Sequence, residues 1–273
     1  MAITATDFDY VRDLVLKRSA IVLEPGKEYL VETRLLPVAR AEGLGGIADL
    51  VRTLRGSPSG ALSSKVVEAM TTNETSFFRD INPWDAFRTK VMPDLLQKRE
   101  KDKVLNFWCA AASSGQEPYT VAIILRENFP QLVNWRVNYV ATDLSSEVLA
   151  KARSGVYSQI EVNRGMPANL LVRYFQRQGL EWKVTDDLRR MVEFKEMNLI
   201  GPWLPMQQLD IVFIRNVLIY FDPPTKKMIL EKIRKVLRPD GYLFLGGAEI
   251  TINLDDRFER MPLERAGVFR IKS

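Results

Sequence analysis

Polar side chains follow three short apolar runs of the chain. Asp143 comes after residues 137–141, Asn198 after residues 191–194, and Arg215 with Asn216 after the nearly continuous apolar run 209–214. If these runs are parallel strands, their carboxyl ends meet at one edge of a sheet, where ligands bind in open α/β folds. Each segment also suits an ordinary loop, and Asn216 is a better candidate for a functional side chain than Asn198.

Histidine is absent from the chain, and Cys109 is the one cysteine. Histidine is the usual general base near neutral pH and the commonest metal ligand. Its absence argues against a zinc site and against Ser-His-Asp or Cys-His catalysis. We therefore expect no metal, and chemistry that depends on carboxylates, Lys, Arg, Tyr or a cofactor with its own reactivity.

Residues 103–124 are the segment around which the rest is organised. An apolar run at 104–108 is followed by small residues up to Gly115, and Glu117 with Pro118 opens a new apolar run. This order predicts a strand, a tight turn and a helix. Small residues in the turn let a ligand approach the backbone N–H groups. The segment predicts a nucleotide-type site, and an ordinary turn of an α/β core remains an equal alternative at this point.

Asp143 lies 28 residues after Gly115 in the chain. A carboxylate at this place can accept both hydroxyls of a ribose, and its alternative role is to cap the helix that starts near Ser145. The G-x-G-x-x-G fingerprint is missing, because the turn holds a single glycine. Without a phosphate cradle a dinucleotide is disfavoured, and a nucleoside without phosphate, such as S-adenosylmethionine, fits better.

The order of patterns predicts two domains. Residues 1–70 predict a small helical domain, residues 71–100 a linker and a helix, and residues 101–273 alternating strands and helices. Repeated βα units give a doubly wound, mostly parallel sheet with helices on both faces. Residues 155–190 do not fit the alternation, and we expect an inserted small β-subdomain there.

The charge and hydropathy of the chain set broad limits on partners. A net charge of +5 and a pI near 9.2 suit nucleic acid, anionic lipid or an acidic protein surface, and equally a mildly basic soluble protein. No apolar run approaches the roughly 18 residues of a membrane span, and the N-terminus lacks the pattern of a secretory signal. We expect a cytoplasmic protein that does not insert into a membrane.

Four segments of the chain are distinctive: T-N-E-T-S-F-F-R-D at 72–80, A-A-A-S-S-G-Q-E-P-Y-T at 110–120, I-R-N-V-L-I-Y-F at 214–221 and L-R-P-D-G-Y-L-F-L-G at 237–246. Together they resemble the CheR family of chemotaxis receptor glutamate O-methyltransferases. Their order and spacing are those of the family, and the resemblance covers about the whole chain. It implies a Rossmann-like class I methyltransferase fold, with S-adenosylmethionine as methyl donor and S-adenosylhomocysteine as product.

The resemblance also implies roles for individual residues. Arg79 and Tyr220 would lie nearest the transferring methyl group, and Asp143 would hold the ribose. The full set of implied donor contacts is Asn73, Thr75, Arg79, Glu117, Asp143, Asn198, Leu199, Arg215, Asn216 and Val217. Simpler alternatives are a pairing of Arg79 with Asp80 or Glu74, and packing of Tyr220 against the sheet.

The implied substrate is a glutamate on a cytoplasmic helix of a membrane chemoreceptor. Lys27 and Arg34 are seven residues apart and so share one helix face, with Arg40 nearby. This face suits an acidic coiled coil, although a solvated helix surface is an equal alternative. Family members that bind a receptor C-terminal peptide resemble one another in a Gly-rich insertion, whereas the segment F-Q-R-Q-G-L-E-W-K-V has one glycine, Gly179. We therefore expect an enzyme that does not depend on such a peptide. We also expect a monomer.

Two other functions remain as alternatives. A nucleic-acid methyltransferase suits the basic charge, but residues 215–218 are not an Asn-Pro-Pro-aromatic motif, and no aromatic–basic stacking platform is visible. A non-catalytic adaptor that binds the donor would lack Arg79 or Tyr220, and both are present. We expect no nucleic-acid partner.

Overall fold

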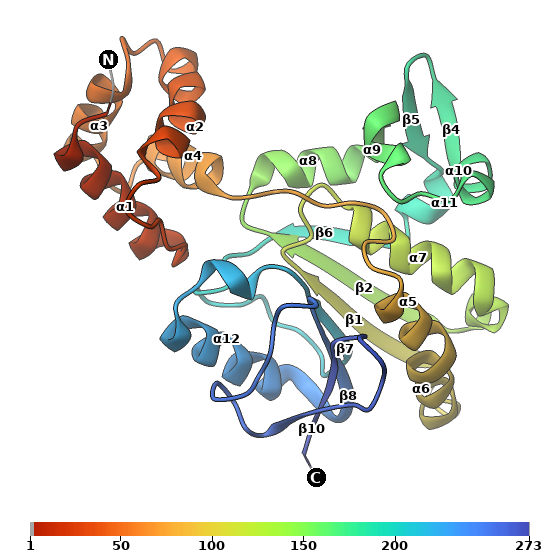
Figure 1. Ribbon diagram of the computed structural model, residues 1–273. Coiled ribbons are helices and arrows are strands. Elements are labelled where there is room, and N and C mark those ends of the chain that lie inside the picture. Colours follow the sequence, from red (N-terminus) through yellow and green to blue (C-terminus); the bar gives the residue numbers. More distant parts are fainter. Residues whose placement is uncertain (1–2, 273) are drawn as a thin grey trace. The chain divides into compact units, whose positions relative to one another are not determined.

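The computed structural model describes residues 3–272, which divide into two compact units. One unit holds the chain up to Thr72 together with Tyr220–Thr225, and the other holds Asn73–Ile219 and the chain from Lys226 on (Figure 1). No helix within residues 3–272 is long and apolar enough to cross a bilayer.

The first unit is built from four helices around one apolar core. The fully buried side chains Val11, Leu35, Leu50 and Val66 come from the four helices in turn. The first helix is capped by Thr4, whose hydroxyl accepts the N–H of Asp7. The helices are α1 (Ala5–Ser19), α2 (Glu28–Ala41), α3 (Ile47–Gly56) and α4 (Ala61–Met70).

The second unit contains a seven-stranded sheet in the order β6-β2-β1-β7-β8-β10-β9. The five strands from β6 to β8 run parallel, and β10 is antiparallel to both of its neighbours. This confirms the mostly parallel sheet expected from the sequence, to which β9 is an unexpected addition. The strands are β1 (Val104–Ala110), β2 (Arg136–Asp143), β6 (Glu193–Glu196), β7 (Leu209–Ile214), β8 (Leu237–Leu245), β9 (Phe258–Arg260) and β10 (Val268–Ile271).

Helices cover both faces of this sheet (Figure 1). Alternate residues of β1 (Leu105, Phe107 and Cys109) share a core with the helices on one face, and α12 packs on the other face through residues such as Ile229 and Ile233. The helix expected within residues 71–100 is interrupted by a π-helical turn at Phe87–Val91. The helices are α5 (Asn82–Ala86), α6 (Met92–Lys98), α7 (Gln116–Asn128), α8 (Ser146–Ser154) and α12 (Pro223–Val236), with short 3-10 turns at Pro130–Asn134 and Leu218–Tyr220.

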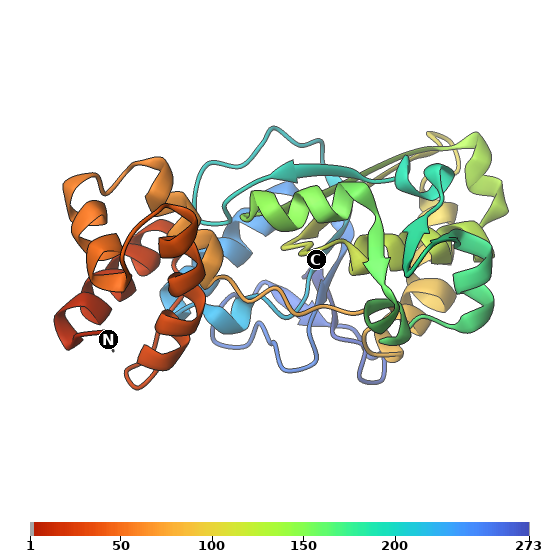
Figure 2. The same cartoon turned by 90° about the horizontal axis from the view of Figure 1, so that it is seen from above.

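The segment between α8 and β6 forms a small separate layer, drawn green to teal in Figure 2. Its three strands pair antiparallel in the order β3-β5-β4. Tyr157 of β3 is fully buried and makes edge-to-face ring contacts with Phe77 and Phe175. The elements are β3 (Val156–Ser158), α9 (Gln159–Asn163), α10 (Ala168–Tyr174), β4 (Phe175–Gln178), β5 (Glu181–Val184) and α11 (Asp186–Arg189).

A buried ionic cluster ties together the amino ends of the central strands. Asp210 is fully buried at the start of β7 and accepts hydrogen bonds from Arg99 Nε at 2.7 Å and from the N–H of Asn106 at 2.8 Å. The other guanidinium nitrogens of Arg99 donate to Asp240 at 2.6 and 3.0 Å. One arginine thus joins β7 to the middle of β8 at the edge of the sheet opposite to the carboxyl ends.

Replacing Arg99 by Met should destabilise the protein. Removing one partner of a buried ion pair is strongly destabilising, and Arg238, whose Nε lies 3.3 Å from Asp210 Oδ1, would remain as the only cation beside this carboxylate in the described residues. We therefore expect the free energy of unfolding to fall by about 3 kcal/mol. Denaturant unfolding at pH 7 measures it, with the exposed Lys101→Met as control. Equal losses in the two variants would contradict a structural role for Arg99.

The difference in unfolding free energy between the wild type and Arg99→Met should depend on pH. The hydrogen bond from Arg99 holds the pKa of Asp240 below its ordinary value. A depressed carboxyl pKa contributes stability above the unfolded-state pKa, about 3.9, and this contribution is lost as the pH falls through the folded-state value. The stability gap between the wild type and Arg99→Met should therefore narrow below about pH 4.

Candidate functional site

The sheet reverses its winding direction between β1 and β7. From β1 the chain proceeds outward to β2 and β6, whereas β7 and β8 lie on the opposite side. The crevice at the carboxyl ends of such strands is where open α/β sheets bind ligands. The segments that follow β1, β2, β6 and β7 meet at this edge, as the sequence predicts.

The turn after β1 has an unusual backbone. Ala111, Ser113 and Gly115 have φ values of 55°, 50° and 96°, all in the left-handed region. A Cβ on Gly115 would lie 3.0 Å from Ala152 Cβ and from the hydroxyl of Tyr157, so the turn admits only glycine there without a shift. Left-handed non-glycine residues cost free energy and persist where the surroundings hold them. This turn is therefore a fixed platform at the start of α7.

Asp143 at the end of β2 is directed at that turn. Its carboxylate accepts the N–H of Ser113 at 2.8 Å and the N–H of Ser145 at 3.0 Å, and the residue is 6% exposed. The helix cap is Ser145, whose hydroxyl accepts the N–H of Val148. Asp143 is thus not the cap of α8; it joins the ends of β1 and β2 and keeps a carboxylate at the ligand edge.

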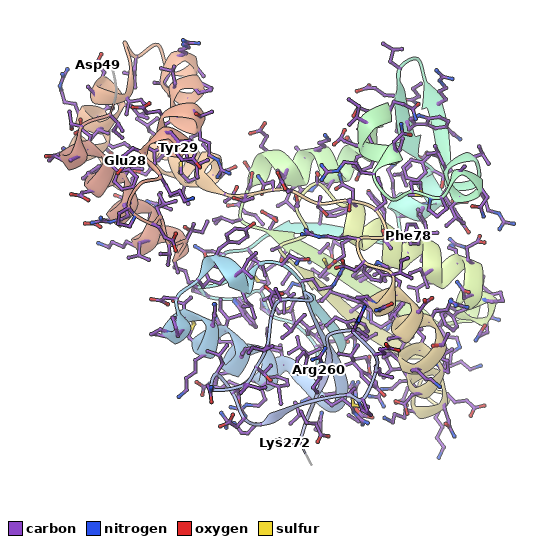
Figure 3. The ribbon with its side chains drawn as sticks, viewed as in Figure 1. Glu28, Tyr29, Asp49, Phe78, Arg260 and Lys272 are labelled. Carbon is purple, nitrogen blue, oxygen red and sulfur yellow. The ribbon has the colours of Figure 1, made fainter. Side chains whose placement is uncertain are left out.

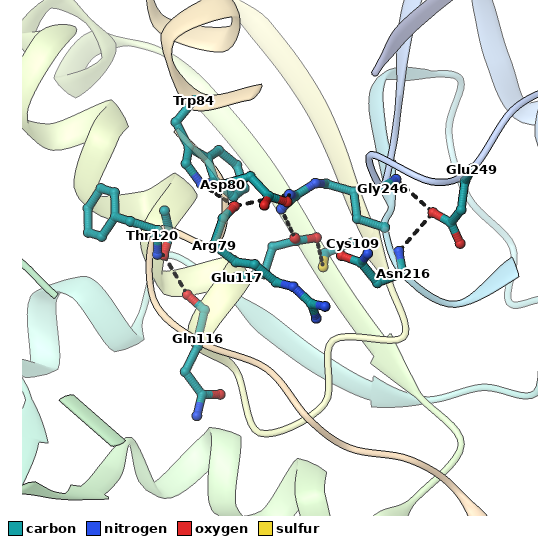
Figure 4. A network of polar contacts seen from close by, with 12 residues as sticks. Arg79, Asp80, Trp84, Cys109, Gln116, Glu117, Thr120, Asn216, Gly246 and Glu249 are labelled. Carbon is teal, nitrogen blue, oxygen red and sulfur yellow. Dashed lines mark hydrogen bonds and ion pairs between the residues drawn. The ribbon is translucent and has the colours of Figure 1, made fainter. Parts of the chain in front are cut away.

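The linker that precedes α5 is fixed along its length at the same edge. The hydroxyl of Ser113 donates to the carbonyl of Asn73 at 2.8 Å, and Thr120 Oγ1 accepts the N–H of Phe78 at 3.0 Å. The indole N–H of Trp84 donates to the carbonyl of Arg79 at 3.0 Å (Figure 4). The guanidinium of Arg79 itself donates to the carbonyl of Glu74 at 3.3 Å. Arg79 is therefore fixed through its backbone, while its charged end is held by one long hydrogen bond.

Arg215 is the centre of a buried ionic network. Its side chain is fully buried and donates to Glu117 at 2.6 Å, to Asp80 at 2.7 Å and to the carbonyl of Arg79 at 3.0 Å. Its guanidinium also lies 4.8 Å from the ring centroid of Trp84. The sequence assigns the side chain of Arg215 to the methyl donor, but these contacts occupy its guanidinium. Arg215 therefore positions the linker and α7. Asp80, not Arg79, is the residue of the linker that forms an ion pair.

Glu117 lies beside Cys109 of β1 (Figure 4) and pairs with Arg215. Glu117 Oε1 accepts a hydrogen bond from the thiol of Cys109 at 3.5 Å. Burial, with the Glu117 carboxylate in addition, raises the pKa of Cys109 well above its ordinary value. Because the thiolate is the reactive form, Cys109 is an inert core residue.

The turn after β7 is held by a carboxylate that the sequence analysis missed. Glu249 is buried, and it accepts the N–H group of Asn216 at 2.8 Å (Figure 4). It also accepts the N–H group of Val217 at 2.9 Å. Asn216 is left-handed, with a φ of 58°. Glu249 follows the carboxyl end of β8 by four residues, which is the same signal that singled out Asp143 and Asn198.

Asn198 and Leu199 lie in the segment after β6. Asn198 Oδ1 accepts the N–H of Ile200 at 3.1 Å, and Leu199 is buried. Lys232 of α12 holds this segment, since its ammonium donates to the carbonyls of Leu199 and Gly201 at 3.1 and 2.6 Å. The segment with Asn198 and Leu199 is therefore held in place by α12. The sequence did not suggest this connection.

The remaining expected residues belong to the helical unit. Tyr220 groups with that unit, whereas Arg79 belongs to the unit that holds the sheet. On α2, Arg34 donates to the carbonyls of Met70 and Thr71 at 2.7 and 2.9 Å and so fixes the end of α4. Arg40 is exposed and Lys27 is half-buried. Lys27 directly precedes Glu28 and Tyr29, which are labelled at the start of α2 in Figure 3. Arg34 thus has a structural role that the sequence did not suggest.

The side chains at this edge of the sheet suit S-adenosylmethionine better than a nucleotide phosphate. Its charged side chains include the carboxylates Glu117 and Asp143, with 14% of the Glu117 side chain exposed. Carboxylates attract the cationic parts of the donor and accept hydrogen bonds from ribose hydroxyls, whereas they repel a phosphate. Thr75 lies half-buried on the same linker as Asn73 and Arg79. Within residues 3–272 we find no cluster of side chains arranged to hold a metal ion.

Comparison with known proteins gives matches along nearly the whole chain. Residues 6–71 match the family described as CheR methyltransferase, all-alpha domain, and residues 73–266 match CheR methyltransferase, SAM binding domain. Chemotaxis protein methyltransferase Cher2 of Pseudomonas putida is 37% identical over 271 residues, which are 97% of this chain and 98% of that protein. Chemotaxis protein methyltransferase 1 of Pseudomonas aeruginosa is 38% identical over 277 residues and 100% of both chains. The chemotaxis protein methyltransferase of Vibrio parahaemolyticus is 36% identical over 278 residues, 99% of each.

Replacing Arg215 by Lys should disrupt the network. A single ammonium cannot bridge two carboxylates and a carbonyl as the planar guanidinium does. We expect the free energy of unfolding to fall by about 3 kcal/mol, and the affinity for S-adenosylhomocysteine to fall with it. Denaturant unfolding and calorimetric titration measure the two effects, and the exposed Arg136→Lys is the matched control. Unchanged affinity in Arg215→Lys would show that the network does not support the ligand edge.

Proposed function

Because the chain belongs to the CheR methyltransferase family, we propose that it methylates glutamate side chains of membrane chemoreceptors, as part of adaptation in chemotaxis. Family membership makes it an S-adenosylmethionine-dependent methyltransferase. The observation that carries the proposal is the set of fixed carboxylates and left-handed turns at the switch point of the sheet, together with the absence of histidine.

A glutamate acceptor explains how the reaction proceeds without histidine. A glutamate side chain has an ordinary pKa of about 4.3, so it is already an anion at neutral pH and needs no general base. S-adenosylmethionine, when bound, supplies the methyl group on a positively charged sulfur. The task of the protein is then to align the acceptor carboxylate and to exclude water, and such alignment is worth roughly 7–11 kcal/mol in favourable cases.

We assign positioning roles to Arg79 and Tyr220. The guanidinium of Arg79 is held by one long hydrogen bond to a carbonyl, which leaves it donors for an acceptor carboxylate. An arginine that bound the carboxylate too tightly would stabilise the ground state and slow the transfer. Tyr220 is half-buried, and its hydroxyl can donate to a carboxylate oxygen.

The other implied residues bind the donor in this proposal. Asp143 accepts the ribose hydroxyls, because a carboxylate oxygen has acceptor capacity beyond its backbone hydrogen bonds. Glu117 attracts the positive charge at the methionine end, where the linker residues Asn73 and Thr75 lie. The remaining contacts, on the adenine and sulfur side, come from Asn198, Leu199, Asn216 and Val217. Arg215 acts through Glu117 and Asp80.

The variants Arg79→Ala and Tyr220→Phe test the catalytic assignment. Each should lower kcat by at least about tenfold while the Kd of S-adenosylhomocysteine stays within about threefold of the wild type. The assay follows labelled methyl groups from S-adenosylmethionine onto receptor-rich membranes, and their release by base identifies a methyl ester. If both variants kept the wild-type turnover, the assignment would be wrong. Labelling of DNA or RNA instead of receptor would favour the nucleic-acid alternative.

We place the receptor on the outer face of α2. Lys27 and Arg40 remain available there, whereas Arg34 is engaged at the end of α4. A basic face suits the acidic helices of a cytoplasmic receptor bundle. The proposal includes a monomeric, cytoplasmic enzyme that needs no receptor C-terminal peptide, since the β4–β5 connection has a single glycine, Gly179. Neither nucleic acid nor membrane insertion is part of it.

Charge reversal on α2 tests the receptor surface. Arg40→Glu should raise the KM for receptor several-fold, flatten its dependence on salt, and leave the affinity for S-adenosylhomocysteine unchanged. Arg52→Glu on α3, another exposed arginine, is the matched control. Receptors with and without their C-terminal residues should give equal rates. Equal effects of the two reversals would favour a merely solvated helix face.

A further inference from the structure

Glu249 forms an unusually complete carboxylate site. One carboxylate oxygen accepts the N–H groups of Gly246 at 2.6 Å and Asn216 at 2.8 Å. The other accepts the N–H groups of Val217 at 2.9 Å and Ile219 at 3.3 Å. The residue is 6% exposed. Four backbone donors thus converge on one buried anion.

No cation balances this carboxylate within residues 3–272. Among the salt bridges of the described residues, such as those of Arg215, Arg234 and Arg257, none involves Glu249. The N–H dipoles of the turn after β7 therefore supply the compensation. A carboxylate without a countercharge, held by backbone N–H groups, fixes those groups in direction, because each dipole must point at the same anion.

The segment held in this way carries two expected donor contacts, Asn216 and Val217. Asn216 adopts its left-handed conformation between the end of β7 and the 3-10 turn at Leu218–Tyr220. Gly246 permits the approach, since a Cβ there would lie 2.6 Å from Asn216 Nδ2 and 2.8 Å from Glu249 Oε2. If the backbone of this turn rotated, the side-chain amide of Asn216 would change its position with it.

We propose that Glu249 is a positioning residue for binding of the methyl donor. It orients Asn216 and Val217 by accepting hydrogen bonds from the backbone N–H groups of their turn. The inference rests on the proposed function for the identity of the ligand. It assigns a role to the G-G-A-E segment after β8, which the sequence resemblance left without one. Glu249 acts through the turn and does not touch the reacting atoms.

The geometry makes an unusual prediction for the isosteric change Glu249→Gln. Both oxygens of Glu249 face N–H donors, so the amide NH2 of Gln would face two donors in either orientation of the side chain. Gln should therefore fail to replace Glu, although it matches it in size. Asp keeps the charge but is shorter by one methylene, so it should give an intermediate result.

The experiment uses the full chain with the variants Glu249→Gln, Glu249→Asp and Glu249→Ala, and with the exposed Glu264→Gln as control. Calorimetry gives the Kd of S-adenosylhomocysteine, and receptor methylation gives kcat and the KM for S-adenosylmethionine. We expect Glu249→Gln to raise Kd and KM by about tenfold or more, since buried N–H groups lose their acceptor. The kcat at saturating donor should change by less than about threefold.

Chemical rescue separates positioning from general support of the fold. Added acetate should restore part of the donor affinity of Glu249→Ala, whereas acetamide, which has the same shape without the charge, should not. Wild-type affinity in Glu249→Gln, or a lowered kcat with unchanged KM, would overturn the inference. If Glu249→Gln does not fold, Glu249→Asp decides: wild-type affinity in that variant also overturns it. A wild-type protein that binds S-adenosylhomocysteine but does not methylate receptor would refute the proposed function and leave this inference intact.

Discussion

The ligand edge depends on one fully buried cation. Removing a guanidinium from water costs several kcal/mol unless hydrogen-bonded anions surround it, and Arg215 meets this requirement only when Glu117, Asp80 and the carbonyl of Arg79 are all in place. These groups come from the start of α7 and from the linker, so a single desolvated charge dictates where both segments lie. The left-handed Asp80, with a φ of 62°, is acceptable in this setting because the ion pair holds it.

The negative groups of the site are stabilised in different ways. Glu249 is compensated by backbone N–H groups, and Asp143 accepts two backbone N–H groups. Glu117 is compensated by Arg215. Backbone compensation fixes a carboxylate in one orientation without adding a mobile side chain or a full positive charge. The edge therefore remains attractive to a cationic, hydroxyl-rich ligand, although it is rigid before that ligand arrives.

The sequence predicts those parts of the site that follow from local order along the chain. Polar residues directly after apolar runs, such as Asp143 and Asn216, were found because parallel strands bring their carboxyl ends together. The partners of Arg215 could not be found in this way, since Glu117 and Asp80 precede it by 98 and 135 residues and local patterns carry no information about such pairs. Arg34 was assigned to a surface for the same reason, because its acceptors at the end of α4 are 36 and 37 residues away. Glu249 was missed although it follows a strand end, because its partners Asn216 and Val217 precede it by 33 and 32 residues.

The long sequence separations within the ionic network have a consequence for the synthesis of the protein. Contacts between distant parts of a chain form late, because the entropy of loop closure must be overcome first. The turn after β1 and the linker are made early, yet they lack their buried counterion until β7 has been synthesised, and the turn after β7 lacks Glu249 until β8 is complete. A nascent or truncated chain therefore cannot assemble the ligand edge, and competence to bind the donor is acquired as a last, cooperative step of folding.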